Sequence, residues 1–108
     1  MTTKFKREDY LAAGPVLERL VKGNMTFAKL LGAIRLGEET SLVEFAKKLG
    51  ISRSHLCDIE QGRKTVSPAR AAKFAKKLGY SEKHFITLAL QDIVRRDGFK
   101  FVVKLEAA

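Results

Sequence analysis

Residues 41–62 read SLVEFAKKLGISRSHLCDIEQG and contain the signals of two short helices joined by a tight turn. Ser41 followed three residues later by Glu44 is a capping box, which favours a helix that begins at the next residue. Gly50 can adopt the left-handed backbone conformation that ends such a helix, and Ser52 can cap the following one. The pattern therefore predicts two helices, over residues 42–49 and 53–61.

Two helices joined by so short a turn are typical of the helix-turn-helix motif, whose second helix enters the major groove of DNA. The stretch also resembles the phage repressor/Cro-like, or Xre-type, regulators. The resemblance is carried by the run EFAKKLGIS at 44–52, by Leu56 and by IEQG at 59–62, and it extends more weakly over 27–78. It implies a mainly α, lambda-repressor-like bundle of about five helices that binds double-stranded DNA. Two residues depart from the family pattern: Leu42 stands where many relatives have a phosphate-contacting Gln, and Asp58 places a negative charge on the second helix.

The distribution of charge favours a polyanionic partner. The net charge is +9, and residues 41–79 hold nine basic side chains against three acidic ones. A clustered positive field suits a polyanion, because the release of counterions contributes to affinity. A solvated basic surface would have the same composition, so the charge supports the motif and does not replace it.

Composition and motifs also bound the class of protein. The 108 residues suffice for one domain. One cysteine, Cys57, excludes an intramolecular disulfide and is typical of a reducing compartment. The sequence shows no signal peptide and no apolar run of about 18–20 residues, so we expect a cytoplasmic protein with no membrane partner. It contains no phosphate loop and no ligand set for a metal, and we expect neither enzymatic activity nor a cofactor.

Three regions follow from the remaining signals. We expect an amino-terminal arm with short helices over residues 1–24, the DNA-binding domain over 25–80, and a carboxy-terminal helix and strand over 81–108. Thr26, Ser67 and Ser81 are placed to cap further helices. These helices are predicted over 27–36, 68–78 and 82–96.

The last residues alternate with a period of two. Phe99, Phe101, Val103 and Leu105 share one face of a predicted β-strand. A lone strand leaves its backbone donors and acceptors unpaired, so it needs a partner. One candidate is the segment 2–6 of the same chain. The favoured one is the same strand of a second copy, antiparallel about a two-fold axis, which would make the protein a homodimer.

Projecting residues 53–61 as a helix turns Leu56 and Ile59 inward. The resemblance places base contacts at the start of this helix and near Asp58. Arg53 can donate two hydrogen bonds to guanine, and a carboxylate would favour the amino group of cytosine. Asp58 could instead pair with Arg53 or Arg63, and His55 could be a solvated side chain. The predicted base-reading residues are Arg53, Ser54, His55 and Asp58.

Other basic residues are placed to hold the DNA backbone, which fixes the register of a complex without specifying its sequence. The predicted phosphate contacts come from Arg63, Lys64, Lys47, Lys48 and the start of the helix at Ser67. The resemblance further implies that Glu60 pairs with Arg35 on the first helix of the domain and so fixes the recognition helix to the fold.

Together these features predict a sequence-specific transcriptional regulator, a repressor that binds an inverted-repeat operator as a homodimer. The alternative is an antitoxin, which binds a toxin protein and represses its own operon. Antitoxins of this class often carry an acidic or disordered neutralising segment. The tail here is short and carries Lys100 and Lys104, which favours the plain regulator.

Overall fold

The computed structural model describes residues 25–108, which contain five helices and no strand. The arm and short helices expected over residues 1–24, and with them the segment 2–6, lie outside the described residues. The mainly helical class is confirmed, and each helix begins and ends within about one residue of its predicted bounds. The helices are α3 (Phe27–Gly37), α4 (Leu42–Leu49), α5 (Arg53–Glu60), α6 (Pro68–Leu78) and α7 (Glu82–Arg96).

Local capping sets these boundaries. A serine or threonine in an extended conformation precedes every described helix, and its hydroxyl accepts a hydrogen bond from the backbone N–H three residues on. Gly50 ends α4 with φ 76° and Gly79 ends α6 with φ 77°. A residue with a β-carbon is disfavoured in that left-handed conformation, so the backbone favours glycine at both positions. The capping residues are Thr26, Ser41, Ser52, Ser67 and Ser81.

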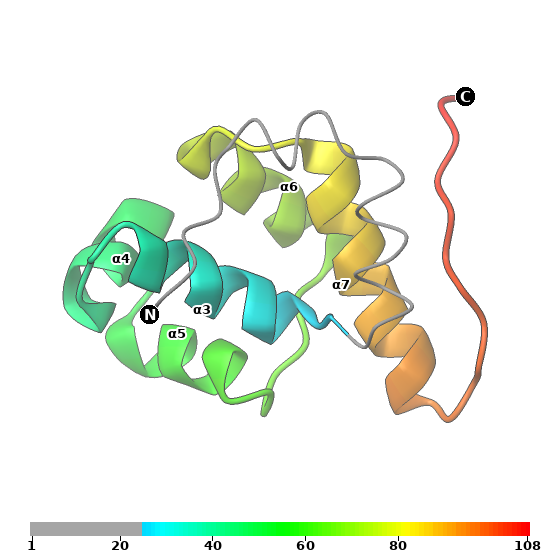
Figure 1. Ribbon diagram of the computed structural model, residues 1–108, viewed down its shortest axis with the longest axis horizontal. Helices are drawn as coiled ribbons and strands as arrows, with labels where there is room; N and C mark the ends of the chain where they lie inside the picture. Colours follow the sequence, from blue (N-terminus) through cyan, green and yellow to red (C-terminus); the bar gives the residue numbers. More distant parts are fainter. Residues whose placement is uncertain (1–24) are drawn as a thin grey trace.

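Helix α3 lies at the centre of the bundle, with α4 and α5 toward one end and α7 at the other (Figure 1). Three aromatic rings join α3 to α6 and α7. The Phe27 ring meets Phe85 edge-on with centroids 5.6 Å apart, and it lies 6.5 Å from the ring of Phe74. Edge-to-face packing suits the charge distribution of aromatic rings. The other fully buried large side chains are Phe45, Leu30, Leu31, Ile34, Leu49, Leu56, Ile59, Leu78 and Leu88.

The start of α3 is held against the last turns of α7. The Phe27 N–H donates to the Asp92 carboxylate at 3.1 Å, and the Arg95 guanidinium donates to the carbonyl of Met25 at 3.1 Å. The first N–H groups of a helix have no partner inside the helix, so Asp92 satisfies one of them from a distant element. The carboxy-terminal helix is therefore part of the bundle that positions the DNA-binding motif.

The predicted strand at 99–105 is not formed in the described structure. Gly98, with φ 87°, turns the chain back after α7, and the tail runs alongside that helix without a paired strand (Figure 1). The physical reason is that a strand is defined by backbone pairing, and the tail bonds to a side chain, that of Gln91. Phe99 and Phe101 are 56% and 69% exposed. Pairing of the tail across a dimer stays a prediction.

Candidate nucleic-acid interface

The inner face of α5 is fixed by two side chains that are almost completely buried, Leu56 and Ile59. Their burial turns the opposite face of the helix to solvent. At its first turn Arg53 and Ser54 are exposed, and the described residues hold no hydrogen-bond or ion-pair partner for the Arg53 guanidinium. The start of a recognition helix is the end that enters the major groove. These two of the four predicted base-reading residues therefore point outward with their polar atoms available.

A two-pronged ion pair holds the end of α5 to α3. The Arg35 guanidinium donates to both Glu60 carboxylate oxygens, from Nε to Oε2 at 2.9 Å and from Nη2 to Oε1 at 3.1 Å. A third N–H of Arg35 donates to the carbonyl of Thr40 at 3.1 Å, in the loop before α4. The Arg35 and Glu60 side chains are only 17% and 10% exposed. The structure thus brings together the pair that the resemblance implied, and it ties α3, α5 and the α3–α4 loop at one point.

Asp58 faces the basic loop that follows α5. Arg63 Nε donates to Asp58 at 2.8 Å, and the Lys64 ammonium lies 3.5 Å from the other carboxylate oxygen. The hydrogen bond from Arg63 holds the pKa of Asp58 below its ordinary value, because it stabilises the ionised form. Of the two ion pairs considered from the sequence, the structure forms the one with Arg63 and not the one with Arg53. Asp58 therefore orients two of the predicted phosphate contacts.

His55 contacts a residue of the next helix. An Arg70 N–H group lies 2.9 Å from Nε2 of the imidazole. Arg70 can only donate, so this contact needs a neutral ring nitrogen that accepts. Partial burial, followed by the charges of Arg70 and Lys64, lowers the pKa of His55. The structure therefore places His55 and Arg70 side by side at the junction of α5 and α6, in a contact that favours the neutral imidazole.

The remaining predicted phosphate contacts lie on the surface around α5. Lys47 and Lys48 are exposed in the last turn of α4, and Lys48 Nζ lies 3.3 Å from Glu38. The Ser67 hydroxyl accepts from the N–H of Arg70 at 3.2 Å and so caps α6. Exposed positive side chains thus lie on α4, in the loop that follows α5 and at the start of α6. Such an arrangement can hold the two phosphate backbones that border a groove.

Two contacts that position this surface were missed from the sequence. Lys77 donates to the carbonyl of Leu49 at 3.0 Å and so caps the end of α4. Arg96, at the end of α7, donates to the carbonyl of Arg63 at 3.3 Å. Both residues are far in sequence from the groups that they contact. Their basic character was visible, but their partners depend on how α6 and α7 pack.

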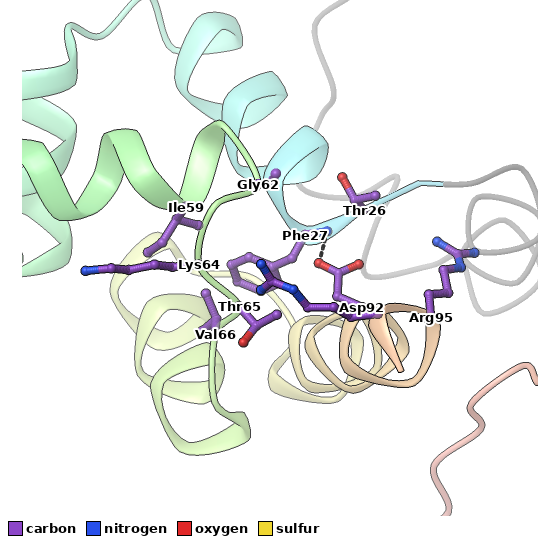
Figure 2. Close-up of a pocket in the computed structure, with 11 residues that line it drawn as sticks. Thr26, Phe27, Ile59, Gly62, Lys64, Thr65, Val66, Asp92 and Arg95 are labelled. Atoms are coloured by element: carbon purple, nitrogen blue, oxygen red, sulfur yellow. Dashed lines mark hydrogen bonds between the residues drawn. The ribbon is translucent and has the colours of Figure 1, made fainter. Parts of the chain in front are cut away.

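A hollow of about 300 Å³ lies beneath the loop that follows α5, between the start of α3 and the last turns of α7. Figure 2 shows that Asp92 points toward the start of α3, whereas Lys64 points away from the start of α3. Burial raises the pKa of Asp92. Lys64, Arg95 and Arg96 line this hollow, and the two arginines already donate to the carbonyls of Met25 and Arg63. The charged surface on the outside of α5 therefore remains the candidate site.

Two features are absent from residues 25–108. That part of the chain has no cluster of three or more His, Cys, Asp or Glu side chains that could hold a metal ion. None of its helices has the length and apolar character needed to cross a membrane.

Comparison with known proteins agrees with this geometry. A family described as helix-turn-helix matches residues 31–85. No curated protein and no solved structure matches the chain significantly. The matched region contains α4, the turn, α5 and α6 in full, together with the residues discussed above from Arg35 to Arg70. Because that match covers just over half of the 108 residues, the chain belongs to the Xre/Cro-like helix-turn-helix family of DNA-binding regulators.

Proposed function

We propose that the protein is a sequence-specific transcriptional repressor that binds an inverted-repeat operator as a homodimer. The observation that carries this proposal is the outer face of α5. Its inner residues are buried, Glu60 and Arg35 fix its end, and Arg53 and Ser54 are exposed at its start. A rigid helix with outward polar groups and a rim of cations is what reading of the major groove requires.

The surrounding contacts suggest separate roles for the charged residues. Arg53, with no partner among the described residues, is the residue that we assign to a base. Asp58 orients Arg63 and Lys64, which we assign to phosphates. Asp58 and His55 can still reach bases if DNA displaces their present partners. Repression is the role that we propose for this mode of binding, because a protein seated on an operator can block access to it.

Selection from a random pool of DNA duplexes at near-physiological salt tests the proposal. We expect enrichment of an inverted repeat whose half-sites lie about one helical turn, or a multiple of it, apart. Binding without enrichment of any sequence would show that only the basic surface acts, and would contradict sequence-specific regulation. A single enriched half-site would contradict the homodimer and leave base reading intact.

Two variants separate base reading from backbone contact. Arg53→Ala should weaken binding by about 1–3 kcal/mol on the selected sequence and lose discrimination at one base position. Lys64→Ala should weaken binding to every sequence alike. It should also lower the slope of log K against log salt concentration by about one, which corresponds to the loss of one phosphate contact. Equal weakening on all sequences by Arg53→Ala would reassign Arg53 to a phosphate.

The antitoxin alternative shares the DNA-binding surface and differs in its second partner. The exposed rings of Phe99 and Phe101 are a surface that another protein could cover. The tail also carries Lys100 and Lys104 and only one acid, Glu106, and so lacks the acidic character common in neutralising segments. A toxin-like gene beside this one, with a product that forms a defined complex with this chain, would favour the antitoxin.

A further inference from the structure

The side chain of Gln91 holds the carboxy-terminal tail in a strand-like conformation. Its amide donates to the carbonyl of Phe101 at 2.7 Å, and its oxygen accepts from the N–H of Val103 at 2.7 Å. The Gln91 amide thus bonds to the carbonyl of one residue and to the N–H of the residue two positions later. A residue of a neighbouring β-strand makes the same two hydrogen bonds. Gln91 is 1% exposed, so the two bonds are shielded from water.

This tether determines which backbone groups of the tail face outward. In an extended chain, successive peptide groups point to opposite sides. The groups of Phe101 and Val103 that bond to Gln91 point inward, so the N–H and C=O of Val102 point away from the helix. Val102 makes no backbone hydrogen bond among the described residues and is 44% exposed. The outer side of the tail is therefore an edge that can accept another strand.

Side-chain chemistry selects the register of a symmetric partner. In an antiparallel pair centred on Val102, Lys100 would lie opposite Lys104, and centred on residue 104 two copies of Lys104 would meet. Like charges directly opposite each other destabilise a strand pair. A pair centred on Phe101 would place Lys100 opposite Val102 and leave Leu105 without an apolar partner. A pair centred on Val103 also places a lysine, Lys104, opposite Val102, but it brings no like charges together and gives Leu105 an apolar partner, Phe101.

We propose that two copies of the chain pair through this edge, antiparallel and centred on Val103. Each Val103 then lies opposite the other, each Phe101 lies opposite Leu105, and each Lys100 lies opposite Glu106. Phe101 and Leu105 match on the apolar face, Lys100 and Glu106 match in charge, and Gln91 supports the ribbon from within each subunit. This inference rests on the homodimer of the proposed function and defines its interface.

Disulfide trapping tests the register directly. In a Cys57→Ser background, which removes the free thiol of α5, Val103→Cys is compared with Val102→Cys and Phe101→Cys. Directly opposed residues at a pair without mutual hydrogen bonds have Cα atoms about 4.5 Å apart, within the disulfide range of about 4.4–6.8 Å. We expect mild oxidation to convert most of the Val103→Cys protein into a covalent dimer, and at least several-fold less of the other two.

Other outcomes overturn the inference in distinguishable ways. Preferential trapping at Val102→Cys or Phe101→Cys would place the axis at another residue. A dimer in sedimentation of the reduced protein with no trapping at these three positions would place the interface elsewhere and leave the homodimer intact. A monomer at all concentrations, still able to enrich a DNA sequence, would reject both the ribbon and the homodimer and keep base reading.

A charge exchange tests the same register without cysteines. Lys100→Glu alone and Glu106→Lys alone should each raise the dimer dissociation constant several-fold, because each places like charges opposite each other. The double variant should return the constant close to that of the parent. Gln91→Leu should also weaken the dimer, since leucine cannot bond to Phe101 or Val103. Single exchanges without effect, or a double variant as weak as the singles, would overturn the proposed register.

Discussion

Removal of the Glu60 carboxylate should destabilise the fold far more than it changes DNA sequence preference. Glu60 accepts two hydrogen bonds from Arg35, and both side chains are largely withdrawn from water, at 10% and 17% exposure. Glu60→Ala would leave the Arg35 guanidinium in that site with only the carbonyl of Thr40 as an acceptor. A charge without its partner in a desolvated site is costly, because water cannot replace the lost bonds.

The magnitude follows from the degree of burial. Surface ion pairs contribute up to about 1 kcal/mol, whereas breaking a fully buried pair costs about 3–5 kcal/mol. The Arg35–Glu60 site retains some exposure, so we expect a loss of about 2–3 kcal/mol in the free energy of unfolding. For a domain of this size that loss lowers the melting temperature by roughly 10–20 °C.

Thermal unfolding followed by circular dichroism measures this loss, and Glu38→Ala is the matched control. Glu38 pairs with Lys48 at 3.3 Å, but both side chains are well exposed, at 35% and 44%. The control should therefore lose less than about 1 kcal/mol. DNA selection below the melting temperature of Glu60→Ala should return the sequence of the parent. An unchanged melting temperature, or a loss no larger than that of Glu38→Ala, would refute the reasoning; a changed sequence preference would make Glu60 a reading residue.

Three further predictions concern backbone fit and pH. Gly32→Ala should stabilise the protein by about 0.5–1 kcal/mol in urea unfolding, because alanine favours the helix. The added β-carbon would lie 3.5 Å from the Glu60 carboxylate, which is an ordinary contact. Destabilisation would mean that the added methyl group disturbs the Arg35–Glu60 pair. Gly50→Ala should cost about 1–2 kcal/mol in the same assay, since φ is +76° and the β-carbon would lie 2.5 Å from the Lys77 ammonium; an unchanged unfolding midpoint would contradict a need for glycine there. The lowered pKa of His55 means that the unfolded chain binds more protons between its folded pKa and 6.5, so this histidine makes stability rise with pH across that window and fall on acidification. His55→Gln should therefore lose less stability than the parent between pH 8 and pH 5 when urea midpoints are compared, and an identical pH profile would contradict the assignment.

The limits of the helices could be predicted from the sequence because their causes are local. Each capping hydroxyl bonds to an N–H only three residues away, and Gly50 ends α4 through its own φ angle. The buried face of α5, with Leu56 and Ile59, followed from helical spacing for the same reason. The pairing of Arg35 with Glu60 came from the family pattern of residues rather than from periodicity.

Tertiary packing decided the partners of the long polar side chains. The sequence left Arg53 and Arg63 as possible partners of Asp58, and the course of the loop after α5 places Arg63 beside it. His55 meets Arg70, which is fifteen residues away on another helix. Gln91 was not singled out, although it shares the buried side of α7 with Leu88. Its hydrogen bonds to the tail explain why the predicted strand is extended but unpaired in the single chain.

The sequence alone determined where this chain forms helices and which side of each is apolar, because capping, backbone preference and periodicity act within a few residues. The tertiary structure decided which charges meet, which side chain holds the tail and which edge of the tail faces solvent. Those choices depend on distances between elements that are remote in sequence, and only the packing of the whole bundle sets these distances.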